Sequence, residues 1–120
     1  MICTSIEQSK HLLELGLAPK TADMVWMFNK WLYSIKDNIL NREQFSEQDT
    51  LAWSLSALLD VISKVTCISY LTIDSSFLMR CKDLGFLWQK DIASKNPVTA
   101  AYEMVCWLLE QGLIKKIGEQ

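Results

Sequence analysis

The strongest constraint on the fold is a helix signal near the C-terminal end of the sequence. Asn96 is a good N-cap, and Pro97 suits the first helical position, where its missing N–H costs nothing. Gly112 can close the helix in the left-handed conformation, which predicts a helix over 97–111. Its apolar side is broad and contains Ala100, Ala101, Met104, Val105, Cys106, Trp107, Leu108 and Leu109. A helix with this much apolar surface must be covered by other elements, so the rest of the chain has to supply a large packing surface.

A second helix signal lies near the start of the sequence. Thr4 and Glu7 have the spacing of a capping box, in which each side chain satisfies a backbone amide of the first turn. Gly16 can end this helix, with Leu17 folding back onto its last turn. These residues predict a helix over 5–15.

The third helix signal follows Trp53. Ser54 is a good N-cap, and Trp53 before it can pack on Leu58 as a hydrophobic staple. We therefore predict a helix over 55–64. The inward-facing residues of this segment would be Leu58, Val61, Ile62 and Val65.

The segment between the last two predicted helices has strand character. Residues 68–73 are rich in β-branched side chains and alternate as a half-buried strand does. Residues 74–76 form a turn signal, and 77–82 and 86–90 can continue an antiparallel meander, with a second turn over 83–85. We therefore expect three strands in this segment.

The segment from Met24 to Tyr33 fits two structures. A helical stripe would contain Met24, Phe28, Trp31 and Ile35. A strand face would contain Met24, Trp26 and Phe28. Periodicity alone does not separate the two in a short apolar run. We favour an extended start over 24–28, and we expect the polar residues 36–50 to form a loop.

These elements predict an α+β fold with a small antiparallel sheet of three or four strands packed against about three helices. The 120 residues suit one domain and half of them are apolar, so we expect a single domain over 1–120 with one core. The formal net charge is -2, and no basic run exceeds Lys115 and Lys116. Because nucleic-acid-binding proteins usually carry a basic stripe, we do not expect a nucleic-acid partner.

Export and membrane signals are absent from the sequence. The opening residues lack the basic and apolar regions of a secretion signal, and no run of about 18 apolar residues could span a bilayer. We therefore expect a cytoplasmic protein with no membrane partner. In that compartment the four cysteines, at positions 3, 67, 81 and 106, should be reduced thiols. Cys106 is predicted to lie in the core, and Cys81 is predicted to be more exposed.

No group of residues in the sequence forms a recognisable catalytic, metal or cofactor motif. His11 is the only histidine and has no nearby nucleophile, so we expect a solvated or boundary imidazole. The cysteines include no C-x-x-C pair, which argues against a zinc site. The glycines occur singly, so there is no phosphate-binding loop. We predict no cofactor, no metal and no catalytic residue, although an enzyme of unknown type stays open.

The unusual feature of the sequence is an aromatic cluster. Trp26, Phe28, Trp31 and Tyr33 lie in one short segment whose only charge is Lys30. Two of the predicted helices already offer enough apolar surface for a core of this size, so part of the cluster should stay at the surface. Exposed aromatic clusters mark partner surfaces, because Trp and Tyr dominate binding energy there. Ordinary packing in the core or at its rim is the alternative.

Three blocks of the sequence carry a resemblance to a known group. They are residues 15–24 (LGLAPKTADM), 52–59 (AWSLSALL) and 101–109 (AYEMVCWLL). In this order they resemble a group of small uncharacterised proteins of gut Bacteroidales and their phages and mobile elements. That group commonly has Pro before the Ala-Trp pair, whereas Leu51 stands here, so the loop before the helix can differ. The resemblance carries no established activity, and it implies functions typical of mobile elements, such as binding and disabling a host factor.

Together these observations predict a non-enzymatic protein-interaction module. The resemblance implies a phage or mobile-element accessory protein that binds and modulates a host protein. The alternative is a small-ligand or nucleotide-binding module with an aromatic-lined pocket, which would need a concave site with a few convergent polar groups. The expected contact surface is Trp26, Phe28, Trp31 and Tyr33, with another protein or a second copy of this chain as the partner.

Overall fold

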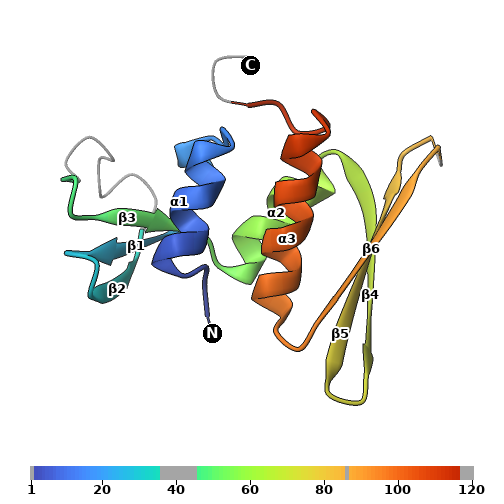
Figure 1. Cartoon of the computed structure of the whole chain (residues 1–120), viewed down its shortest axis with the longest axis horizontal. Helices are drawn as coiled ribbons and strands as arrows, with labels where there is room; N and C mark the ends of the chain where they lie inside the picture. The colour runs from blue at the N-terminus through green and yellow to red at the C-terminus, as the bar shows by residue number, and fades with distance from the viewer. Residues whose placement is uncertain (1, 36–45, 86, 117–120) are drawn as a thin grey trace.

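In the part of the chain that the structure describes, three helices lie between two three-stranded antiparallel sheets (Figure 1). The computed structural model describes residues 2–35, 46–85 and 87–116. In chain order the elements are α1 (Ile6–Glu14), a 3-10 turn η1 (Pro19–Thr21), β1 (Met24–Met27), β2 (Trp31–Ser34), β3 (Thr50–Ala52), α2 (Leu55–Ser63), β4 (Thr66–Ile73), β5 (Ser76–Asp83), β6 (Gln89–Ser94) and α3 (Pro97–Glu110). The predicted α+β class is confirmed, and so are the three helices and a three-stranded antiparallel sheet. The second sheet is a finding of the structure.

The ends of α3 form as the sequence predicts. The Asn96 side chain accepts a hydrogen bond from the amide of Val98 at 2.9 Å, which caps the first turn. Gly112 has a φ of 74°, and the amide of Leu113 donates to the carbonyl of Leu108 at 2.9 Å. This pattern is a Schellman motif, in which a left-handed glycine lets the chain satisfy the last carbonyls of the helix.

The capping box of α1 is one residue later than predicted. The Ser5 hydroxyl accepts from the amide of Gln8 at 3.1 Å, and the Gln8 side chain accepts from the amide of Ser5 at 3.0 Å. The prediction of Thr4 and Glu7 was wrong because Thr4 is fully buried. Its hydroxyl accepts a hydrogen bond from the amide of Trp53 at 3.0 Å. The Thr4 hydroxyl therefore takes part in a tertiary hydrogen bond with Trp53 and does not form the α1 cap that the local spacing predicted.

The first sheet has the strand order β2-β1-β3, with β1 in the centre. The extended start predicted over 24–28 is confirmed, and the helical alternative for this segment is wrong. β1 pairs with β2 across a tight turn, and with β3 through partners such as Val25 and Leu51. Of the loop predicted over 36–50, residues 36–45 lie outside the described part of the chain, and Thr50 already belongs to β3.

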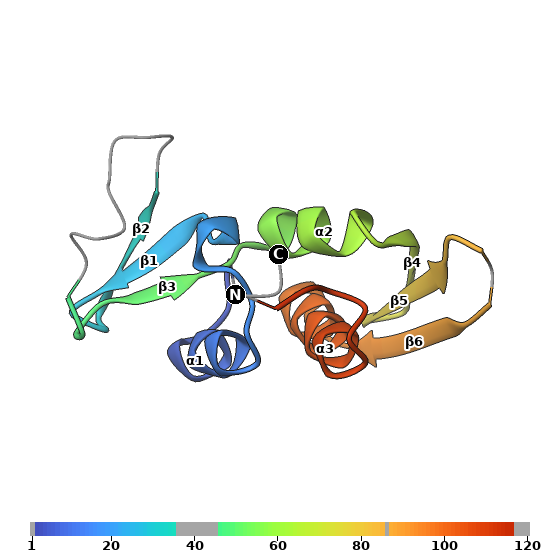
Figure 2. The same cartoon turned by 90° about the horizontal axis from the view of Figure 1, so that it is seen from above.

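The second sheet is a meander in the order β4-β5-β6, and α2 and α3 cover one of its faces (Figures 1 and 2). Its third strand is Gln89–Ser94 and not 86–90 as predicted. The connection is longer because the amide of Asp83 donates to the carbonyl of Trp88 at 3.0 Å, and the Asp83 carboxylate accepts from the amide of Leu87 at 3.3 Å. These bonds hold the chain in a turn up to Trp88. Phe86 lies outside the described residues.

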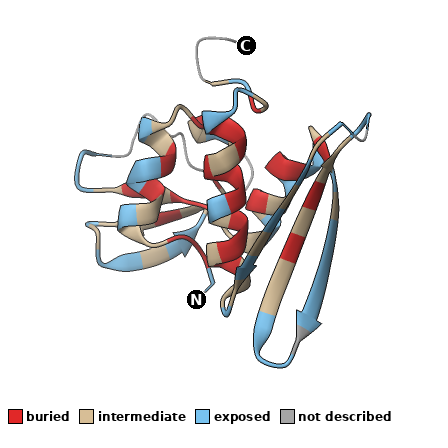
Figure 3. Ribbon diagram, turned by 45° about the vertical axis from the view of Figure 1, so that its right-hand side comes forward, coloured by how far each residue is buried: buried red, intermediate tan, exposed pale blue. Residues whose placement is uncertain are grey.

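The core lies where the three helices meet β5, and Figure 3 shows the buried positions concentrated on the helices. The apolar side predicted for α3 is buried at seven of its eight positions, and Trp107 is partly buried against the core. The seven are Ala100, Ala101, Met104, Val105, Cys106, Leu108 and Leu109. Leu58, Val61 and Ile62 of α2 are buried too, while Val65 is partly buried against the core. Trp53 is 0% exposed and belongs to the same cluster as Leu58, which is consistent with the predicted staple.

The junction between β3 and α2 is tied to the start of β1. Ser54 is the N-cap of α2, as predicted, and its hydroxyl accepts from the amide of Ala57 at 3.2 Å. The same hydroxyl donates to Asp23, and the Ser54 amide donates to the other oxygen of that carboxylate at 2.8 Å. One serine therefore caps a helix and connects it to the residue that precedes β1.

Replacing Ser54 with alanine should lower the free energy of unfolding by about 1–2 kcal/mol, because both the cap and the bond to Asp23 are lost. Chemical denaturation monitored by circular dichroism measures this change. Ser56→Ala is the matched control, since Ser56 is exposed on the same helix, and it should cost less than about 0.5 kcal/mol. Equal effects of the two substitutions would contradict the assignment of Ser54 as a structural cap.

Candidate functional site: the aromatic face of the β1–β2 hairpin

The β1–β2 hairpin gathers five apolar side chains that we call the aromatic face: Val25, Met27, Phe28, Trp31 and Tyr33. Val25 pairs with Tyr33, and Met27 pairs with Trp31. Directly paired residues of an antiparallel sheet project to the same side, so these four share one face of the hairpin. Phe28 follows at the turn. Strand alternation and the pairing of β1 with β2 thus bring these side chains together on one face.

Three members of the aromatic face are more than half exposed. The exposed fractions are 56% for Phe28, 56% for Trp31 and 55% for Tyr33, whereas Val25 is 0% exposed and forms the floor. The Phe28 and Trp31 rings meet edge to face, with centroids 6.1 Å apart. The face borders a hollow of about 530 Å³ that Ser34 also lines. Lys30 places its ammonium 6.0 Å from the centre of the Trp31 ring.

Trp26 does not join the other predicted site residues. It is half-buried on the opposite side of β1, and its indole N–H donates to the carbonyl of Thr4 at 3.1 Å. The structure therefore brings together Phe28, Trp31 and Tyr33, and it separates Trp26 from them. Val25 and Met27 were not predicted as site residues; they follow from the period of two in β1 together with the pairing of β1 with the strand that contains Trp31.

The turn that carries Phe28 has an unusual backbone. Phe28 and Asn29 both have a φ of 54°, and the amide of Lys30 donates to the carbonyl of Met27 at 3.0 Å. These features are those of a type I′ turn, in which both central residues need positive φ, and the turn lies within the three-residue connection between Met27 and Trp31. Asn suits that conformation, but a bulky aromatic residue rarely adopts it. Phe28 is therefore held in a strained position.

Asp49 holds the strained turn in place. Its carboxylate accepts hydrogen bonds from the amide of Phe28 at 2.8 Å and from the amide of Ser46 at 3.0 Å. These bonds favour the charged form and lower the pKa of Asp49. Asn29 adds a second tie, because its side-chain oxygen accepts from the Thr50 hydroxyl at 2.6 Å. The neighbouring segment thus fixes the turn from two sides.

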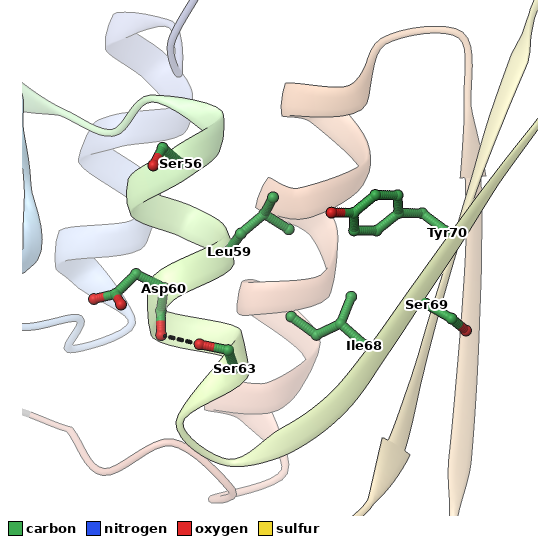
Figure 4. A pocket seen from close by; sticks show the side chains of 7 residues that line it. All are labelled: Ser56, Leu59, Asp60, Ser63, Ile68, Ser69 and Tyr70. Carbon is green, nitrogen blue, oxygen red and sulfur yellow. Dashed lines mark hydrogen bonds between the residues drawn. The ribbon is translucent and has the colours of Figure 1, made fainter.

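A second hollow, of about 610 Å³, lies between α2 and β4 (Figure 4). Leu59 points into it from the helix, and Ile68 and Tyr70 point into it from the strand, whereas Ser69 points away (Figure 4). Tyr70 is 57% exposed and stacks on Phe77, with ring centroids 5.6 Å apart. This hollow combines an apolar floor with a strand that is at the edge of its sheet.

The titratable side chains do not form a catalytic arrangement among the described residues. His11 is exposed and lies 3.9 Å from the Glu14 carboxylate. Burial raises the pKa of the Cys106 thiol to about 11 and that of Tyr102 to about 12, so both groups stay protonated at neutral pH. A protonated thiol is a poor nucleophile.

The cysteines differ in exposure. All four are free thiols, and Cys106 lies in the core as predicted. The prediction that Cys81 is more exposed was wrong, because Cys81 faces the helices from β5 and is 0% exposed, whereas Cys67 is exposed. Burial also raises the pKa of Cys3 and of Cys81.

Metal and membrane features were sought over residues 2–35, 46–85 and 87–116. No three side chains of His, Cys, Asp and Glu come together there as a metal site. No helix in this part of the chain has the length and apolar character that crossing a bilayer requires.

Comparison with protein-family models, with curated proteins and with solved structures finds no match.

The Asp49 anchor should hold at neutral pH and fail in acid. The pKa of Asp49 in the folded protein lies below its ordinary value of 3.8. The stabilisation it gives is therefore fully present above the pKa of the unfolded chain and is lost as the pH falls through the lower pKa of the folded state. In an NMR titration, the amide signals of Phe28 and Ser46 should shift with an inflection below pH 3.8. The Asp49→Asn variant should lack this inflection, and an inflection at higher pH would contradict the anchor.

The cysteines should differ in reactivity in the native protein. A thiol reagent should label Cys67 quickly and should label the three buried thiols only after unfolding, because reaction needs an accessible thiolate. Mass spectrometry of the labelled protein counts the modified sites. The Cys67→Ser variant is the control and should take up no label while folded. A native protein whose mass indicates disulfides would overturn the prediction of reduced thiols.

Proposed function

We propose that this protein is a non-enzymatic protein-interaction module whose aromatic face binds another protein. The observation that carries the proposal is the placement of Phe28, Trp31 and Tyr33 together on one surface, each more than half exposed. Exposing large aromatic side chains costs solvation free energy that burial against a partner recovers. Trp and Tyr are also the residues that most often dominate the energy of protein interfaces.

The backbone of Phe28 supports the same proposal. A left-handed conformation costs an aromatic residue about 1–2 kcal/mol, and Asn or Gly at this position would avoid that cost. The Phe28 side chain gives nothing to the core in return, because it is more than half exposed. Strain that does not serve packing is typical of functional positions. Binding of the Phe28 ring by a partner is a direct reason for the chain to keep it.

The aromatic face is also preorganised for binding. The Phe28 amide is tied to Asp49 at 2.8 Å, and the Phe28 and Trp31 rings support each other edge to face. Aromatic side chains have few rotatable bonds, so fixing them in advance lowers the entropy lost on association. Lys30, which lies beside Trp31, adds one positive charge that would favour an acidic group at the rim of the partner's surface.

The resemblance to proteins of gut Bacteroidales and their phages and mobile elements suggests which partner to test first. We propose that the partner is a protein of the host cell, which an accessory protein of such an element would bind and modulate.

Two substitutions in the aromatic face should weaken binding without unfolding the protein. Trp31→Ala should reduce affinity for the partner by at least about tenfold, as truncation of a central interface Trp usually does. Phe28→Asn should also weaken binding, while the free energy of unfolding stays the same or rises by up to about 1 kcal/mol because the strain is relieved. Pull-down with the tagged protein identifies the partner, and calorimetry with that purified partner measures the affinities.

Leu87→Ser is the matched control for loss of an exposed apolar side chain, since Leu87 is 87% exposed and lies on the turn between β5 and β6. It should leave the affinity unchanged. A fall of about 3–5 kcal/mol in the stability of Trp31→Ala would instead assign Trp31 to the core and remove the main support for the proposal. Equal binding by wild type and both aromatic-face variants would do the same.

A second candidate is a small-ligand site, which the hollow of about 530 Å³ beside the aromatic face favours by its size. Such a site needs several convergent polar groups, and Ser34 is the one polar side chain among its described lining residues. It therefore ranks below protein binding. A flat aromatic ligand that quenches tryptophan fluorescence in the wild type but not in Trp31→Ala would reverse the order.

A further inference from the structure

β4 is an edge strand without the features that normally protect an edge. It is eight residues long, contains no charged residue, no proline and no glycine, and has a strand neighbour on one side only among the described residues. An unpaired edge offers a row of free backbone donors and acceptors to another strand. Proteins usually block such edges with charges, proline or bulges, because uncharged edges otherwise associate.

The opposite edge of the same sheet shows the contrast. β6 is shorter, with six residues, and it carries Lys90 and Asp91. Asp91 is also engaged in a paired hydrogen bond with Arg80 of β5, at 2.8 and 2.9 Å. The charged side chains that normally protect an edge are therefore present in β6 and absent from β4.

We propose that β4 pairs with β4 of a second copy of this chain, antiparallel about a two-fold axis at Ser69, to give a continuous six-stranded sheet. In this register Ile68 lies opposite Tyr70 of the second copy, and Thr66 lies opposite its Thr72. Cross-strand pairs of an aromatic with a β-branched residue stabilise antiparallel sheets. Both copies use the same surface in this pairing, so the assembly is a closed dimer.

The lack of charge in β4 is what favours a second copy over a strand of another protein. Around a two-fold axis every residue near the centre meets itself or a close neighbour, so a single charge there would face a like charge. A strand from a different protein could tolerate a charged edge by carrying the opposite charge. The small net charge of -2 per copy also opposes association only weakly.

The hollow between α2 and β4 fits the same arrangement (Figure 4). Leu59, Ile68 and Tyr70 give it an apolar floor next to the open edge, and Ser56, Asp60 and Ser63 of α2 also line it. Asp60 is paired with Lys64 at 3.4 Å. In the proposed register Tyr70 of the second copy lies beside Ile68 on the helix-facing side, so its ring would cover this floor. The 57% exposure of Tyr70 in the single copy would fall on both sides of the axis.

Sedimentation equilibrium of the purified chain tests the pairing. The wild type should sediment as a dimer at about 100 μM, and Ser69→Lys should raise the dimer dissociation constant at least about tenfold, because two like charges would meet at the axis. Ser69 is exposed and points away from the helices, so the fold should survive, which circular dichroism checks. Ala93→Lys, at an exposed position of β6, makes the same charge change at the protected edge and should leave the dimer intact.

Three results would overturn the pairing: a monomeric wild type, a Ser69→Lys variant as dimeric as the wild type, or open-ended aggregates instead of a closed dimer. Trp31→Ala separates this proposal from the proposed function, since it should lose partner binding but keep the dimer. Dimer loss in Trp31→Ala and not in Ser69→Lys would move the interface to the aromatic face. In a Cys67→Ser background, Ser69→Cys should form a disulfide between copies on mild oxidation, and Ala93→Cys should not.

Discussion

Burial of Trp53 with all its polar groups satisfied is the constraint on which the arrangement of the elements depends. Its amide donates to the Thr4 hydroxyl at 3.0 Å, its carbonyl accepts from the amide of Thr4 at 2.9 Å, and its indole N–H donates to the Thr21 hydroxyl at 2.9 Å. A buried indole is stable only when its N–H has a partner, so these bonds and the apolar contacts require each other. Thr4 just before the α1 cap, the turn η1 and the junction of β3 with α2 are therefore joined at this one residue.

The position of the aromatic face follows from that junction. Asp23 binds the Ser54 amide at 2.8 Å and leads directly into β1, so the hairpin leaves the core in a fixed direction. Strand alternation then decides which aromatic side chains turn back toward the core. Trp26 does so and bonds to Thr4, whereas Trp31 and Tyr33 on the paired strand project to the other side and stay more than half exposed. The aromatic face is therefore exposed for two reasons: strand alternation decides which side chains share a face, and the bond between Asp23 and Ser54 fixes where the hairpin starts.

The sequence correctly predicted the features that are determined by interactions between residues close together in the chain. The caps at Ser54 and Asn96 and the buried stripe of α3 depend on residues within one or two turns, and all are present. The failures come from contacts over long sequence separations. Thr4 left the capping box because Trp53 takes its hydroxyl, and the first sheet depends on pairing β1 with β3, which no local pattern specifies. For the site, the aromatic surplus predicted exposure. The positive φ of Phe28 was not predicted, because Phe is not a residue that signals such a turn and the Asp49 carboxylate that binds its amide is distant in sequence.

The two proposed surfaces, the aromatic face and the edge of β4, lie at opposite ends of the folded molecule, whose longest extent is 41 Å (Figures 1 and 2). A dimer formed through β4 would keep the helices of both copies, and the aromatic faces beyond them, on the same side of the continuous sheet, because a two-fold axis perpendicular to a sheet preserves its two faces. Each face would then be available to a separate partner molecule or to repeated sites on one assembly. Linking two sites in this way can raise the apparent affinity for a multivalent target by about 10²–10⁴ without any new contact at either site. A shallow aromatic face of modest intrinsic affinity could therefore act effectively on an oligomeric or densely packed host target, and the uncharged edge of β4 would supply that gain.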